Sequence, residues 1–189
     1  MNDPTATAIL DATRASILDF GIRRTTLSDI ARRAGVSRVT VYRRYPDADA
    51  VLRALMTREF GELMEGVGAN VGGRDARARV VARLSASVRA LRGHPLLRKV
   101  LEVEPELLLP YLLRRMGETQ RHGLGLMTKD IAEGQKDGSV REGDARTTAQ
   151  LLLLLAQAVV LSGATVEDMA EETLQREFER VVDAALAPA

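Results

Sequence analysis

The sequence RRTTLSDIARRAGVSRVTVYRRY spans residues 23–45 and carries seven arginines against a single acid. Two short helical patterns meet in it across Ala34-Gly35-Val36, where glycine permits a left-handed turn that a side chain would disfavour. Thr26 precedes the first pattern and Ser37 the second, each at the position of a capping residue. The stretch therefore predicts a positively charged helix–turn–helix, an arrangement that lays one helix in the major groove of DNA.

The second of these helices is expected over residues 38–44, with Val41 and Tyr45 facing inward. The side chains left outside suit the reading of base edges, because arginine bonds guanine bidentately and valine or a threonine methyl contacts a thymine methyl. This outward set consists of Arg38, Val39, Thr40, Tyr42 and Arg43.

Phosphate contacts are expected around this reading helix. Thr26 and Ser28 offer hydroxyls and free backbone N–H groups at the start of the helix expected over residues 27–34. Ser37 offers a hydroxyl at the start of the helix expected over residues 38–44. Arg44, with Arg23 and Arg24, is expected to steady the DNA backbone. Arg32 and Arg33 lie on the outer face of the helix expected over residues 27–34, and they are expected to take little part in DNA binding.

Composition places the chain among globular proteins. It has 189 residues, 46% hydrophobic and 28% charged, with 3% aromatic residues and no cysteine. Disulfides and thiolate metal sites are excluded, and a core of aliphatic side chains suits packed helices. The first 53 residues carry nine arginines and six acids, so positive charge is concentrated at one end, as expected if that end meets phosphates.

The periodicity predicts an all-α fold without strands. Helices are expected over residues 5–20, 27–34, 38–44, 48–67, 75–92, from His94-Pro95 onward, 112–136, 145–162 and 166–186. Capping residues Asp3, Thr26, Ser37, Asp47 and Asp144 precede five of them. The apolar run Leu151–Leu161 is too short to cross a membrane and predicts a core helix. The first residues lack the pattern of a signal peptide, which favours the cytoplasm.

The helix–turn–helix region resembles a known family. Thr26-Leu27, Ile30-Ala31, Ala34-Gly35-Val36-Ser37, Tyr42, Tyr45-Pro46 and Leu52 match the signature of tetracycline-repressor-like (TetR) regulators over about residues 9–56. Two positions depart from it. Val39 replaces the usual small residue before Thr40, and Ala48 replaces a lysine that in the family commonly helps to hold a phosphate.

The resemblance implies a one-component regulator that acts as a repressor. It would be an all-helical homodimer that reads a palindromic operator in double-stranded DNA. Residues 1–53 would form the DNA-binding domain, and residues 54–189 a helical bundle for dimerisation and for a small-molecule effector. The fourth helix would link them, and effector binding would shift it and release the DNA. No cofactor and no membrane partner are implied. A protein partner in place of the small molecule is the alternative.

Two further surfaces are predicted in the C-terminal half. The five consecutive leucines Leu151–Leu155 point to every side of their helix. One side can pack in the core of the same chain, and the other side needs a second surface to cover it. The expected dimer interface joins Leu151, Leu154, Leu155 and Ala158 to Leu174, Phe178 and Val181 of the last helix. The expected effector pocket is lined by Tyr111, Met116, Gln120, His122 and Met127; ordinary core and surface positions are the alternative.

Other chemistry finds little support. The two histidines, His94 and His122, have no partners at metal-ligand spacing, and no catalytic constellation or phosphate-cradling glycine loop is present. An enzyme with an incidental helix–turn–helix is therefore disfavoured, and no metal is expected. Glu102, Glu104 and Glu106 alternate near a proline break; they are expected to form a solvated acidic segment, with a cationic ligand as the alternative.

Overall fold

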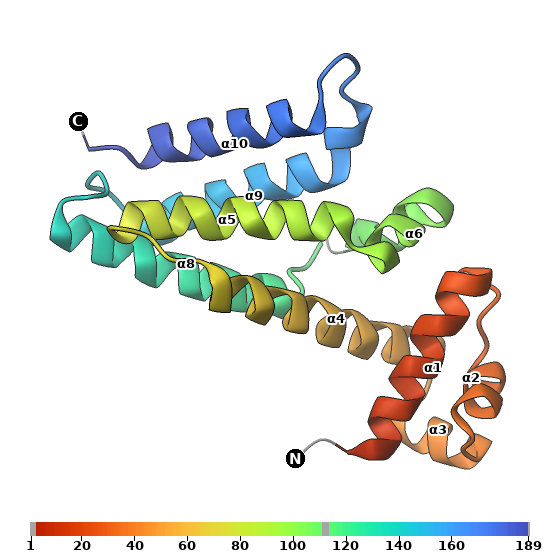
Figure 1. Ribbon diagram of the computed structural model, residues 1–189. Helices are drawn as coiled ribbons and strands as arrows, with labels where there is room; N and C mark the ends of the chain where they lie inside the picture. The colour runs from red at the N-terminus through yellow and green to blue at the C-terminus, as the bar shows by residue number, and fades with distance from the viewer. Residues whose placement is uncertain (1–2, 111–113, 189) are drawn as a thin grey trace. The chain divides into compact units, whose positions relative to one another are not determined.

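A computed structural model describes residues 3–110 and 114–188, and within these ranges the chain forms helices and no strands (Figure 1). Contacts divide it into two compact units. Unit 1 holds Met1–Gly61 and His94–Arg115, and unit 2 holds Glu62–Gly93 and Met116–Ala189. The expected all-α fold, with an N-terminal helix–turn–helix joined by a fourth helix to a helical bundle, is confirmed. The division after residue 53 remains a prediction about functional domains.

Unit 1 is built on a three-helix N-terminal arrangement. It contains α1 (Pro4–Phe20), α2 (Leu27–Ala34) and α3 (Arg38–Arg44), the first half of α4 (Ala48–Asn70), α6 (Pro95–Val103) and the 3-10 helix η1 (Pro105–Leu108). Its core is aliphatic, as the composition predicts. Side chains exposed by 2% or less come from every one of these α-helices: Ile9, Ile17, Ile30, Val41, Val51, Leu55 and Leu96.

Local hydrogen bonds explain where the first helices begin. The Asp3 carboxylate accepts the Thr5 N–H at 2.9 Å, Ser37 Oγ accepts the Thr40 N–H at 3.1 Å, and Asp47 Oδ1 accepts the Ala50 N–H at 2.6 Å. Each satisfies a donor that has no partner within its helix. The capping residues expected at these positions are therefore confirmed.

Unit 2 is a bundle of α5 (Ala76–Gly93), α8 (Glu118–Asp137), α9 (Ala145–Ser162) and α10 (Glu171–Leu186), with the short η2 (Gly163–Thr165) after α9 (Figure 1). Helix α5 packs against the other three. The shared core is again aliphatic apart from one ring, and its members that are exposed by 4% or less are Val80, Val88, Leu124, Ile131, Val140, Ala149, Leu152, Phe178, Val182 and Leu186.

Three helix boundaries differ from those expected. Helix α4 continues through Gly66 and Gly68 to Asn70, because isolated glycines weaken a helix without ending it. The helix expected from residue 112 is described from Glu118, where the Gln120 side chain accepts the Gly117 N–H at 2.6 Å. Helix α10 begins at Glu171 instead of residue 166, since η2 and a positive φ of 62° at Asp168 occupy the preceding segment.

The buried face of α10 contains only one of the three residues predicted there for the dimer interface. Gln175, Phe178, Val182 and Leu186 are buried, whereas Val181 is 50% exposed. Gln175 faces inward because its amide donates to the Ser85 carbonyl oxygen of α5 at 3.1 Å. A pattern of apolar residues cannot anticipate this, because a hydrogen-bonded glutamine there replaces an aliphatic side chain.

Helix α9 is unusually apolar for a helix with so much exposed surface. Ala145–Thr165 is long and apolar enough to cross a membrane by length and composition alone, with a mean hydropathy of 1.6, and only 22% of that window is buried. Ala149, Leu152 and Ala156 nevertheless pack into the core of unit 2. The helix therefore belongs to the bundle, while other apolar side chains of it, among them Leu151 and Leu154, are exposed.

Candidate nucleic-acid interface

The turn between α2 and α3 has the geometry that the sequence predicts. Gly35 adopts the left-handed conformation with φ 67° and ψ 25°, and its N–H donates to the Arg32 carbonyl oxygen at 3.3 Å. The Val36 N–H donates to the Ala31 carbonyl oxygen at 3.1 Å. These bonds close the end of α2 in the manner of a glycine C-cap. They fix the direction in which α3 leaves the turn.

Helix α3 is divided sharply between an inner and an outer face. Val41 is fully buried, whereas Val39 is 72% and Tyr42 is 51% exposed. Arg38 and Arg43 are exposed beside them, and Thr40 is half-buried, with its hydroxyl 2.8 Å from Ser37 Oγ. Exposed apolar side chains of this size on a seven-residue helix are costly in water, so the face suits contact with a partner surface.

Ion pairs sort the seven arginines of residues 23–44 into two groups. Four are paired with acids of unit 1: Arg23 with Glu106, Arg32 with Asp29, Arg33 with Asp19 and Arg44 with Asp3. Within the described residues the other three have no such partner: Arg24, Arg38 and Arg43. Two of the three unpaired guanidinium groups therefore lie on the outer face of α3.

The hydroxyls at the start of α2 differ in their availability. Thr26 Oγ1 accepts the Asp29 N–H at 3.1 Å and lies 2.5 Å from the Asp29 carboxylate, to which it donates. The hydrogen bond from Thr26, with Arg32 nearby, lowers the pKa of Asp29 below its usual value. Ser28 is half-buried and makes no side-chain hydrogen bond within the described residues, so its hydroxyl is free to donate.

A hollow of about 440 Å³ lies where the start of α1 meets α3. Its lining contains two guanidinium groups and two hydroxyls, beside one carboxylate, from Asp3, Thr5, Thr40, Arg43 and Arg44. This excess of cations and hydroxyl donors suits phosphate oxygens. The hollow extends the positive surface from α3 to the first turn of α1.

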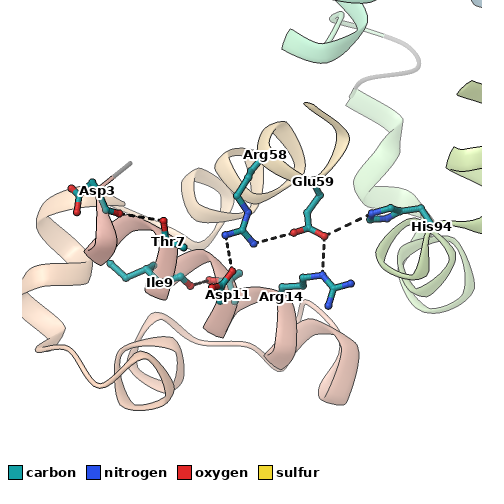
Figure 2. A network of polar contacts seen from close by, with 9 residues as sticks. Asp3, Thr7, Ile9, Asp11, Arg14, Arg58, Glu59 and His94 are labelled. Atoms are coloured by element: carbon teal, nitrogen blue, oxygen red, sulfur yellow. Dashed lines mark hydrogen bonds and ion pairs between the residues drawn. The ribbon is translucent and has the colours of Figure 1, made fainter. Parts of the chain in front are cut away.

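A buried ionic network that the sequence analysis missed holds α1 to α4 (Figure 2). Glu59, 8% exposed, accepts hydrogen bonds from Arg14 Nε at 2.8 Å and from Arg58 at 2.9 Å, while Arg58 also bonds Asp11 at 2.8 Å. His94 Nε2 lies 3.7 Å from the same carboxylate. Glu59 is the buried charge of this network, whereas the side chains of Arg14 and Asp11 are 38% and 63% exposed, so the hydrogen bonds from the two arginines chiefly compensate the burial of the Glu59 carboxylate.

His94 is correspondingly a core group of unit 1. Its ring meets the Phe60 ring edge-on with 5.5 Å between centroids. Burial lowers the pKa of His94 below its usual value; the nearby Glu59 carboxylate acts in the opposite direction, and Arg14 adds to the lowering. The histidine is therefore neutral near pH 7 and packs as an aromatic side chain.

The predicted effector-pocket residues lie in different environments in unit 2. Met116 and the buried Met127 pack in the core of unit 2. Gln120 bonds the N–H of Gly117 at the start of α8, and His122 is exposed. Tyr111 lies outside the described residues. The pocket remains a prediction.

The predicted dimer residues separate into exposed and buried groups. Leu151 and Leu154 are each 60% exposed, Val181 is 50% exposed, and Ala158 is exposed beside them. Leu155 and Leu174 are half-buried. Phe178, only 4% exposed, belongs to the core of its own protomer.

Comparisons with known proteins agree with this geometry. Residues 9–55 match the sequence pattern of the family described as bacterial regulatory proteins, tetR family. An uncharacterized HTH-type transcriptional regulator from Mycobacterium tuberculosis is 35% identical over 161 residues, which cover 85% of this chain and 82% of the relative.

Two solved structures share the fold along almost the whole chain. The SmeT–triclosan complex is 26% identical, with a TM-score of 0.67, and the match covers 98% of this chain and 92% of that one. The transcriptional regulator FadR from Bacillus subtilis in complex with stearoyl-CoA is 20% identical, with a TM-score of 0.66, and the match covers 95% and 97%.

Proposed function

The chain belongs to the tetR family of bacterial regulatory proteins, DNA-binding transcriptional regulators that are not enzymes, and on this premise we propose that it is an effector-responsive repressor. It binds a palindromic operator as a homodimer and leaves it when a small molecule binds. The observation that carries the proposal is the outer face of α3. There Val39 and Tyr42 are exposed, and Arg38 and Arg43 have no acidic partner in the part of the chain that the structure describes.

In this proposal α3 lies in the major groove. Arg38 and Arg43 bond guanine edges, and Val39 with the Thr40 methyl contacts thymine methyl groups. Tyr42 and the free Ser28 hydroxyl bond phosphates, with the hydroxyls of Thr26 and Ser37 and the Arg44 guanidinium. Thr26 and Arg44 exchange their present acidic partners for phosphate oxygens, a change that costs little because both pairs are exposed.

The homodimer is proposed from the uncovered apolar side of unit 2. Leu151, Leu154 and Ala158 of α9 are exposed together with Val181 of α10. Burying a leucine side chain removes about 1.5–3 kcal/mol of unfavourable hydration, and each residue counts twice across a symmetric interface. Phe178 supports this surface from beneath instead of contacting the partner.

A small apolar or amphipathic molecule is proposed as the effector. The related structures hold triclosan in one case and stearoyl-CoA in the other, both with a large apolar part. The core of unit 2 between α5, α8 and α9 is lined by aliphatic side chains and methionines, which suit such a molecule. Action on chromosomal DNA places the protein in the cytoplasm.

Selection of bound sequences from random duplex DNA tests the proposal. The purified full-length protein should enrich a palindrome whose half-sites are one helical turn apart, about 10 base pairs, or a multiple of it. Triclosan and stearoyl-CoA are then added separately to the complex as probes. Enrichment of no sequence would refute specific DNA recognition. Enrichment without release by either probe would leave a partner protein as the better candidate for the signal.

A further inference from the structure

Glu104 is a buried carboxylate in a segment where solvated acids were expected. It ends α6 and precedes η1, and only 6% of it is exposed, in contrast to its neighbours Glu102 and Glu106, whose side chains are 64% and 44% exposed. Within the described residues it forms no ion pair, since the nearby Arg23 pairs with Glu106. A buried charge without a cation requires hydrogen bonds in compensation.

Those hydrogen bonds come from the backbone at the end of α1. The two carboxylate oxygens of Glu104 accept the N–H groups of Ile22 at 3.1 Å and Arg23 at 2.9 Å. Successive N–H groups in a turn form a small anion-binding concavity, which a carboxylate side chain fills here. The contact joins residues more than 80 positions apart in sequence.

Gly21 makes this approach possible. It turns the chain at the end of α1 with φ +83°, a conformation that glycine favours. A Cβ at this position would lie 3.5 Å from Glu104 Oε1 and 3.5 Å from the Val103 methyl, which are ordinary van der Waals distances, so the turn at Gly21, and not its missing side chain, is what the contact requires. The carboxylate is thus held at a defined place beside the loop.

The loop that Glu104 holds leads directly into the recognition motif. Residues 22–25 run from the end of α1 to Thr26, the N-cap of α2, and carry the unpaired Arg24. Moving this loop displaces the start of α2, from which phosphate contacts are proposed. We propose that Glu104 is a positioning residue for DNA recognition, which acts through the Ile22 and Arg23 N–H groups. The inference rests on the proposed DNA-binding function.

The consequence differs for specific and non-specific DNA. Non-specific affinity depends on the number of cations near phosphates, whereas specific affinity requires all contacts to be met in one register. Loss of the Glu104 hydrogen bonds leaves every arginine in place but loosens the loop. Operator binding therefore falls while binding to random DNA is maintained.

Three variants of the full-length protein test this. Glu104→Gln keeps the size of the side chain but has a single acceptor oxygen, so one N–H loses its partner. Glu104→Ala removes both acceptors. Glu102→Gln is the matched control, since it makes the same change of charge in the same segment at an exposed residue that pairs only weakly with Arg98, at 3.9 Å.

Dissociation constants are measured for the selected operator and for a random duplex of equal length, at a temperature where circular dichroism shows every variant folded. Glu104→Gln should raise the operator constant about tenfold, as expected for the loss of a charge-assisted hydrogen bond, and the random-duplex constant by no more than about twofold. Glu104→Ala should raise the operator constant by a larger factor, and Glu102→Gln should have the same two constants as the wild type. Amide exchange at residues 22–23 should accelerate in both Glu104 variants.

An operator constant for Glu104→Gln equal to that of Glu102→Gln would overturn the inference. So would an equal loss on both duplexes, or a lower melting temperature with an unchanged ratio of the two constants, because these describe a merely structural residue. If neither Glu104 variant folds, unchanged discrimination by Glu104→Asp, whose shorter side chain cannot reach both N–H groups, would also overturn it. Failure of the wild type to select any operator refutes the proposed function instead.

Discussion

Substitutions of Gly35 should rank by their tolerance of left-handed backbone and not by their size. Gly35 has φ 67° and ψ 25°, and an added Cβ would meet no atom within 4 Å. A substituted side chain therefore begins in open space, and the loss of stability comes from the strain of the left-handed backbone. The series Gly35→Asn, Gly35→Ala and Gly35→Val isolates this cost.

The free energies follow from the observed conformation. An ordinary L-residue pays roughly 1–2 kcal/mol for the left-handed region, and a β-branched residue is a genuine outlier there. Alanine also lowers the conformational entropy of the unfolded chain relative to glycine, which offsets about 0.4–1 kcal/mol of this cost in Gly35→Ala. Escaping the strain would break the Gly35 and Val36 N–H bonds to the end of α2, at about 1 kcal/mol each. We expect losses of about 1 kcal/mol for alanine, about 2 kcal/mol for valine and less than about 1 kcal/mol for asparagine, which tolerates this region.

Urea unfolding followed by circular dichroism measures the free energies of unfolding, and titration with the selected operator measures binding. Because the turn directs α3, Gly35→Val should also weaken operator binding at temperatures where it is folded, by about tenfold or more for a strain of this size. Gly35→Asn should bind like the wild type. Equal stability and equal operator affinity of the valine and asparagine variants would refute the assignment of this turn.

Three further changes follow from the structure. Arg43→Ala or Arg38→Ala should cost about 1–3 kcal/mol per half-site on the operator and little on random DNA if the arginine reads guanine; an equal loss on both would indicate a phosphate contact, as titration of both duplexes shows. Leu154→Glu should give a 20.6 kDa monomer in sizing chromatography, whereas Leu126→Glu on α8, an exposed leucine outside the proposed interface, should not; a wild-type monomer at micromolar concentration would contradict the dimer. His94→Gln should reduce the loss of stability that accompanies a fall of pH through about 6.5, the usual pKa of histidine. Since the pKa of His94 is lowered in the folded state, the unfolded chain takes up the proton first as the pH falls; an unchanged pH profile in urea unfolding would contradict this.

Short-range patterns were sufficient to predict much of unit 1. The caps at Asp3, Thr26 and Ser37 and the glycine turn at Gly35 each depend on hydrogen bonds between residues two to five positions apart, so a short window of sequence contains both partners. The inward position of Val41 follows from the same local periodicity. The exposed face of α3, for which DNA contact is proposed, was predictable because it consists of the side chains that the inward residues leave outside.

Patterns were less informative where two faces of a helix are both apolar. In α10 the periodicity does not distinguish the face that packs on α5 from the face that stays exposed, and Phe178, which was predicted at the dimer interface, lies in the core of unit 2. The choice depends on the Gln175 hydrogen bond to α5, a partner 90 positions away. The prediction of a solvated acidic segment at the end of α6 failed for a similar reason, since alternation alone does not separate the buried Glu104 from its exposed neighbours.

The sequence by itself therefore determined the all-helical fold, the recognition motif and its positive charge, because caps, turn glycine and helical periodicity are local interactions. The tertiary structure alone decided which arginines remain unpaired, and that Glu59 and Glu104 are buried acceptors. Their partners Arg14 and Ile22 lie 45 and 82 positions away. Such pairs arise only when packing brings distant segments together and burial makes every unsatisfied polar group costly.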